Sequence, residues 1–158
     1  MANEGYVEGG DILLYYNSGT DVAPVWTPFA GSTSHKYSAS LGMREISNKD
    51  LAGKKKRKPG TFEAPDITID GMISYDGADW DLIYGLFSAK TKMLVKYSGR
   101  PSADTGKIEA VEAAGDKYLE GNGWFTSVSR DDANDANSTY SATISLETMP
   151  TIKTVAGA

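Results

Sequence analysis

Alternation of apolar and polar residues dominates the sequence. Every second position is apolar across residues 138–147, and the same two-residue period recurs over 66–75 and 33–41. Successive side chains of a strand point to opposite faces, so this pattern predicts antiparallel sheet with one buried and one solvated face. Shorter apolar runs predict further strands at 11–16, 92–97 and 117–129.

One segment follows a helical period instead. It predicts a helix at about residues 79–90, with four side chains packing on the sheet: Trp80, Ile83, Tyr84 and Phe87. A lone amphipathic helix among strands usually covers a sheet or closes the end of a barrel. The fold class expected is therefore mainly β, an antiparallel β-sandwich or partial barrel with one flanking α-helix.

The chain of 158 residues is long enough to bury one core. We expect a single domain over residues 1–158, with a flexible N-terminus at 1–8, a long loop at 48–65 and a frayed C-terminus at 151–158. No stretch approaches the roughly 18–20 apolar residues of a membrane helix. The absence of cysteine excludes disulfides and thiolate metal sites.

Candidate catalytic chemistry is sparse. His35 is the only histidine and lies on the apolar face of an alternating segment, which favours a packing role. No nucleophile motif accompanies it. Residues 131–137 resemble a calcium loop in composition but lack the glycine and the closing glutamate at EF-hand spacing. We therefore expect no enzyme activity, no cofactor and no metal site.

Positive charge is concentrated in one run, Lys54–Lys58. The chain has 16 Lys+Arg against 21 Asp+Glu, and without this run the balance is 11 against 21, or −10 instead of −5. Gly53, Pro59 and Gly60 bracket the run and predict a loop. Such a concentration suggests a contact with another copy of the chain, although a solvated hairpin tip, an import signal and a nucleic-acid contact remain alternatives.

The polar faces of the alternating strands carry mainly Ser and Thr, where exposed strands usually carry long charged side chains. A surface of short hydroxyls with scattered acids would suit a channel wall past which a polyanion slides without binding. A barrel wide enough for a DNA duplex needs more strands than one chain supplies, so several copies would share its wall. The candidate lumen residues are Ser34, Lys36, Ser38, Ser40, Asp66, Thr68, Asp70, Thr139, Ser141, Thr143, Ser145 and Glu147.

The chain resembles the major tail tube proteins of long-tailed, siphovirus-type bacteriophages. The order of elements and the Ser/Thr spacing match over most of residues 9–150. The stretches that match are Ala30–Ser40, Arg44–Asp50 with its Ser-x-Lys-Asp turn, Ile67–Ser74, Asp79–Ala89, Lys92–Tyr97, Gly121–Ser129 and Ser138–Glu147.

The resemblance implies a structural virion protein of the tail, assembled in the bacterial host cytoplasm. Six copies would form a ring with a continuous inner β-barrel, and rings would stack into a tube that conducts DNA without binding it specifically. The family also implies tape measure, tail terminator and distal tail proteins as partners. It leaves open whether a contractile sheath surrounds the tube. The inter-subunit loop would map to Leu51–Pro65, and the contact residues expected there and at its start are Lys49, Asp50, Lys54, Lys55, Lys56, Arg57 and Lys58.

The sequence is also compatible with two other classes of function. A carbohydrate- or peptide-binding β-module would use Trp26, Trp80 and Trp124 as exposed contacts. A nuclear or nucleic-acid-binding protein would use the basic run, and its affinity for DNA would depend on salt.

Overall fold

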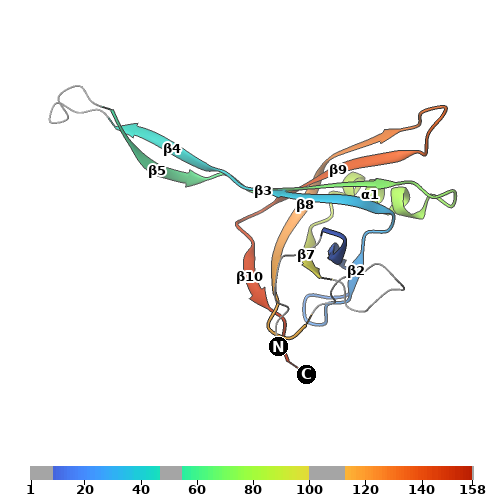
Figure 1. Cartoon of the computed structure of the whole chain (residues 1–158), viewed down its shortest axis with the longest axis horizontal. Coiled ribbons are helices and arrows are strands. Elements are labelled where there is room, and N and C mark those ends of the chain that lie inside the picture. Colours follow the sequence, from blue (N-terminus) through green and yellow to red (C-terminus); the bar gives the residue numbers. More distant parts are fainter. Residues whose placement is uncertain (1–8, 47–54, 100–112, 158) are drawn as a thin grey trace.

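The computed structural model describes residues 9–46, 55–99 and 113–157 (Figure 1). Ten strands and one α-helix lie in this part of the chain, after a short 3-10 helix. In order they are η1 (Gly9–Asp11), β1 (Ile12–Asn17), β2 (Trp26–Pro28), β3 (Ser32–Ser38), β4 (Leu41–Ile46), β5 (Lys56–Phe62), β6 (Asp66–Met72), α1 (Ala78–Ser88), β7 (Met93–Gly99), β8 (Lys117–Asp131), β9 (Thr139–Leu146) and β10 (Thr151–Thr154).

Eight strands form one antiparallel sheet in the order β2-β1-β7-β8-β9-β6-β3, with β10 also paired to β8. The sheet curls on itself, because His35 on β3 packs edge-on against Tyr97 on β7 with ring centroids 6.1 Å apart, although three strands separate β3 from β7 in the sheet order. This confirms the mainly β fold with one helix and antiparallel pairing. It is a partial barrel rather than a closed one.

The core lies inside the curl. Its fully buried side chains come from both halves of the sheet and from α1: Leu14, Ile69, Ile83, Val95 and Ile144 are each less than 2% exposed. β6 and β9 supply every second residue to this core, as the alternation predicts. Burial of a large aliphatic side chain stabilises the fold by about 1.5–3 kcal/mol. Hydrophobic burial is therefore the reason that apolar and polar residues alternate along β6 and β9.

Helix α1 confirms the predicted helix and most of its packing. Ile83 is buried, and Trp80 and Phe87 pack against the core. Tyr84 differs from the expectation: it is 52% exposed and stacks on Trp80 with centroids 5.9 Å apart. Leu82 and Leu86 contact the core as well.

Two segments expected to be irregular form strands. Part of the predicted loop at 48–65 is β5, which pairs with β4 over Lys56–Phe62. Part of the predicted frayed C-terminus is β10, which pairs with Lys117–Glu120 of β8. Both strands are short or exposed along their length, so neither carries the buried alternation by which strands are identified in a sequence. The predicted flexible N-terminus at 1–8 lies outside the described residues.

The β8 strand continues without interruption through its two glycines. Gly121 and Gly123 suggest a turn or bulge, but both continue the ladder with β7. The register shift lies instead between Phe125 and Ser127. Gly123 serves close packing, because a β-carbon there would lie 2.5 Å from the Ser145 carbonyl oxygen.

Gly71 offers a test of this packing. The Tyr140 ring covers it, and the Tyr140 hydroxyl donates a hydrogen bond to the Ala30 carbonyl at 3.1 Å. A β-carbon on Gly71 would lie 2.5 Å from that ring. We expect Gly71→Ala to lower the free energy of unfolding by about 1–3 kcal/mol, measured by urea denaturation. Gly85→Ala is the matched control, since open space surrounds Gly85 within α1, and it should stabilise by about 0.5–1 kcal/mol. Equal effects of the two changes would contradict the packing described.

Candidate functional site: a polar sheet face and a basic arm

The side of β3, β6, β9 and β8 that points away from the core forms one polar face. Pairing of the four strands aligns its residues in rows that run across the sheet. The three rows are Ser34–Asp70–Ser141–Ser129, Lys36–Thr68–Thr143–Ser127 and Ser38–Asp66–Ser145–Trp124. Nine of the twelve predicted lumen residues belong to these rows, and Thr139 continues the same side of β9.

Hydrogen bonds tie the polar face together between strands. Ser34 Oγ donates to Asp70 Oδ2 at 3.1 Å, and Ser145 Oγ donates to Asp66 Oδ1 at 2.6 Å. The Ser129 hydroxyl donates to the Ser141 carbonyl at 3.2 Å. These bonds occupy hydroxyls and acids that would otherwise bind passing groups. The face therefore consists mainly of short side chains, and both of its aspartates are hydrogen-bonded to serine hydroxyls.

The two remaining predicted lumen residues lie at the borders of the face. Ser40 follows β3, and its hydroxyl donates to Glu63 at 2.5 Å. Glu147 follows β9 and pairs with Lys92 at 2.5 Å. Lys92 also lies 5.5 Å from the centre of the Trp124 ring at the end of the third row.

The polar face has an unpaired edge on each side within the described residues. β3 is the last strand of the sheet and pairs only with β6. On the other side, β7 pairs with β8 only as far as Gly123, whereas β9 continues to pair as far as Asp131. The second half of β8 therefore presents one edge without a strand. Such edges are templates for pairing with another chain.

The β4–β5 hairpin forms an arm that projects from the sheet (Figure 1). Its root is held where the Glu63 N–H donates to the Ser40 carbonyl at 3.0 Å. Both strands of the arm are exposed almost throughout. The two strands of the arm pair only with each other and not with the larger sheet. The arm is therefore held in shape by the hydrogen bonds of its own ladder.

The basic run lies on this arm. Lys56, Arg57 and Lys58 belong to β5, and Lys55 precedes it. Lys55 and Arg57 face Glu45 on β4, with nitrogen–oxygen distances of 3.4 and 3.9 Å. The expected contact residues Lys49, Asp50 and Lys54 lie outside the described residues.

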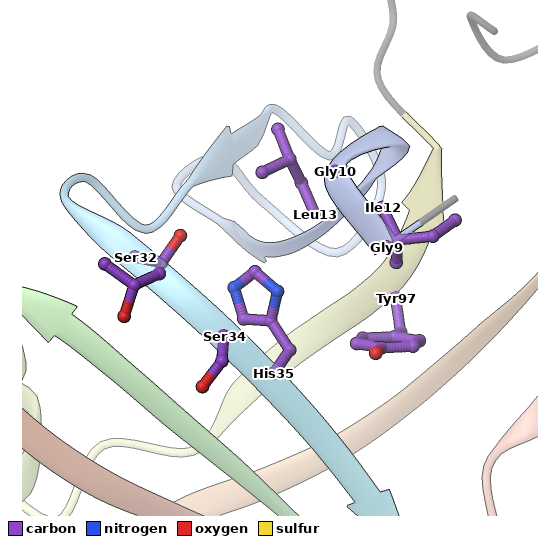
Figure 2. Close-up of a pocket in the computed structure, with 9 residues that line it drawn as sticks. Gly9, Gly10, Ile12, Leu13, Ser32, Ser34, His35 and Tyr97 are labelled. Carbon is purple, nitrogen blue, oxygen red and sulfur yellow. The ribbon is translucent and has the colours of Figure 1, made fainter. Parts of the chain in front are cut away.

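A cavity of about 280 Å³ opens at the seam where β3 approaches β1 (Figure 2). His35 projects into it from β3 toward Gly9, Gly10 and Leu13, with Tyr97 to one side (Figure 2). His35 Nε2 is buried and has no hydrogen-bond partner among the described residues. Burial lowers the pKa of His35, and the nearby Asp70 carboxylate opposes this shift only in part. The histidine therefore packs as a neutral ring.

The three tryptophans are each partly buried under a cation. Lys96 lies 5.8 Å from the Trp26 ring centre, Arg130 lies 5.8 Å from that of Trp80, and Lys92 covers Trp124. A sugar-binding site needs exposed aromatic faces, so this arrangement does not support the carbohydrate-binding alternative.

The described ranges contain neither a metal-binding cluster of side chains nor a membrane-spanning helix. No group of three or more His, Cys, Asp or Glu side chains there is placed to hold a metal ion. No helix there is long and apolar enough to cross a membrane.

Comparison with known proteins gives matches in structure only. No family model matches the sequence. No curated protein matches it either. Among solved structures, the SPP1 tail tube matches with a TM-score of 0.68 at 11% identity, over 96% of this chain and 81% of that one. The tail of an empty GTA particle, refined with C6 symmetry, matches with a TM-score of 0.67 at 13% identity, over 94% and 99%.

Contractile systems give similar matches. The sheath–tube complex of the extracellular contractile injection system PVC, in its extended state, matches with a TM-score of 0.64 at 13% identity, over 96% of this chain and 94% of that one. The chain therefore has the fold of tail tube and injection-tube subunits. The fold resemblance inferred from the sequence is confirmed.

The buried histidine predicts a dependence of stability on pH. Because the pKa of His35 is lowered by folding, the unfolded chain binds a proton below about pH 6.5 that the folded chain does not bind. Stability should therefore fall as the pH drops from about 7.5 to about 5.5. We expect His35→Phe to flatten this part of the curve of unfolding free energy against pH, measured by urea denaturation. An unchanged slope in the variant would contradict the buried neutral ring.

Proposed function

We propose that this protein is a structural subunit of a tail tube, and that its polar face lines the lumen. The observation that carries the proposal is the polar face itself, four strands wide, backed by a core and bounded by two unpaired edges. The fold shared with the SPP1 and GTA tail structures supports it. The subunit would act in the virion tail by assembly alone, without catalysis.

The two edges suit closure into a ring. β8, β9, β6 and β3 are joined by three successive antiparallel pairings, so β3 runs opposite to β8. When copies are related by rotation about one axis, β3 of each copy meets β8 of the next in antiparallel orientation. A continuous antiparallel barrel follows without reversal of any subunit. Six copies would supply 4 × 6 strands and, at about 4.8 Å between strands, a circumference of about 115 Å.

The arm would connect one copy with its neighbours, within a ring or between rings. Its exposure, its separate ladder and its positive charge support this role. Rings stacked in this way would form the tube, and tape measure, terminator and distal tail proteins would act at its interior and ends. DNA would pass through the lumen without specific contacts.

Lysines placed on the polar face should make the lumen retain DNA. Ser127→Lys with Ser129→Lys adds two cations to exposed positions of β8. Tubes of this variant should protect duplex DNA from nuclease at low salt, and the protection should fall as salt rises. As a control, Val22→Lys with Val25→Lys adds the same charge to the exposed segment between β1 and β2 and should give no protection. Equal protection by both variants would place the polar face outside the lumen.

The arm can be tested by removing its charge. We expect replacement of Lys54–Lys58 by Gln to impair polymerisation while leaving the monomer folded, since no described residue of β4 or β5 belongs to the buried core. Single exposed ion pairs contribute only about 0–1 kcal/mol, so the effect depends on repetition around a ring. Electron microscopy and circular dichroism are the measurements. Normal tubes from this variant would contradict the role of the arm.

A further inference from the structure

The two faces of the arm differ in chemistry. On one face, Leu41 pairs with Phe62 and Met43 with Pro59, and the Glu45 carboxylate beyond them forms ion pairs with both Lys55 and Arg57. Leu41, Met43 and Phe62 are 38%, 51% and 64% exposed. This face is therefore apolar near the root, and its charges are already paired within the arm.

The other face carries three cations, Arg44, Lys56 and Lys58. Arg44 and Lys58 lie directly opposite each other in the ladder, and Lys56 follows on the same side of β5. All three are exposed, and none forms an ion pair among the described residues. Like charges opposite each other in a ladder are destabilising. An acidic partner would relieve this repulsion, so the face with Arg44, Lys56 and Lys58 is complementary in charge to an anionic surface.

The opposite end of the molecule has the complementary chemistry. There the β8–β9 turn and the β6–α1 turn lie together, because the Ile73 N–H donates to the Ser138 carbonyl at 2.9 Å and Arg130 lies over the Trp80 ring. Figure 1 shows these turns and the arm at opposite ends of the long axis. We call this region the acidic end. Its exposed acids are Asp76, Asp81, Asp131, Asp132 and Asp135.

Exposed apolar side chains accompany the acids. Met72, the last residue of β6, is 47% exposed. Tyr75, in the turn that follows β6, is fully exposed. Arg130 pairs with Asp132 at 2.8 Å, whereas no ion pair involves Asp81, Asp131 or Asp135 among the described residues. The acidic end thus offers both apolar contacts and unpaired negative charge.

The charges of the two ends balance. Residues 41–62 contain seven Lys+Arg and two Asp+Glu, a net charge of +5. Residues 72–84 and 130–139 together contain one Arg and six Asp, a net charge of −5. The chain outside the arm has nine Lys+Arg and nineteen Asp+Glu, which disfavours nucleic acid as the partner of the arm.

We propose that the arm of one copy docks on the acidic end of a second copy, with Arg44, Lys56 and Lys58 facing its unpaired aspartates. This rests on the proposed tube function and names the surface that receives the arm. Since donor and acceptor lie at opposite ends of one chain, the contact is head-to-tail and leaves a free arm and a free acidic end after each addition. Placed between rings, such a contact stacks them without limit in one direction.

Charge reversal on each side tests this pairing. Lys56→Glu with Lys58→Glu reverses the arm, and Asp81→Lys with Asp135→Lys reverses the acidic end. Each pair of changes alone should lower the tube fraction that sediments by about tenfold, because like charges then meet across the contact. The four changes combined in one chain should restore tubes to near the wild-type level.

The matched control reverses two exposed cations elsewhere, Lys90→Glu with Lys117→Glu, and should leave the tube fraction unchanged. Circular dichroism would establish that each variant is folded. If wild-type tubes form but the combined variant does not recover, the acidic end is not the acceptor, while the tube function stands. Normal tubes from either reversed variant would also overturn the pairing. If the wild-type chain forms neither rings nor tubes, the proposed function itself fails.

Discussion

The structure depends on hydrophobic burial along one side of β6 and β9. Ile67, Ile69, Ala142 and Ile144 are at most 2% exposed, and their position fixes which residues face the other way. A slip of one residue in either strand would exchange the faces, placing isoleucines in water and aspartates in the core. The hydrogen bonds of the polar face join its side chains but do not decide which side of the sheet they occupy. That side is decided by the apolar residues between them.

The long strand β8 links this constraint to assembly. Its first half pairs with β7 and β10, and its second half pairs with β9 alone. One continuous strand therefore belongs both to the part of the sheet with β7 and β10 and to the part with β9 that carries the polar face. The register shift near Thr126 lies at this change of role, where a bulge bends the strand and increases its twist. The same arrangement that completes the core leaves an edge open to another chain.

The polar face could be predicted from the sequence because burial imposes a period of two on β3, β6 and β9. The helix was predictable for the same reason, through a period of 3.6. The arm and β10 could not be predicted in this way: Lys56–Phe62 and Thr151–Thr154 are almost fully exposed, so no core imposes a pattern on them. Pro59 and Gly60 within β5 favour a loop, and a free hairpin tolerates them where a central strand would not. The proposed contact of the arm with a second copy would leave no periodic pattern in the sequence of one chain.

The ladder of the arm has a consequence for how its length can vary. Each residue added to a strand advances the tip by about 3.3 Å and turns the next side chain to the other side. Lengthening both strands by one residue would therefore carry the tip outward but present the apolar and cationic sides the wrong way round. Lengthening both by two would restore the orientation at about 6.6 Å greater reach. Insertions in this hairpin would thus be tolerated when each strand gains two residues. The axial repeat of an assembly built on the hairpin would then change in discrete steps.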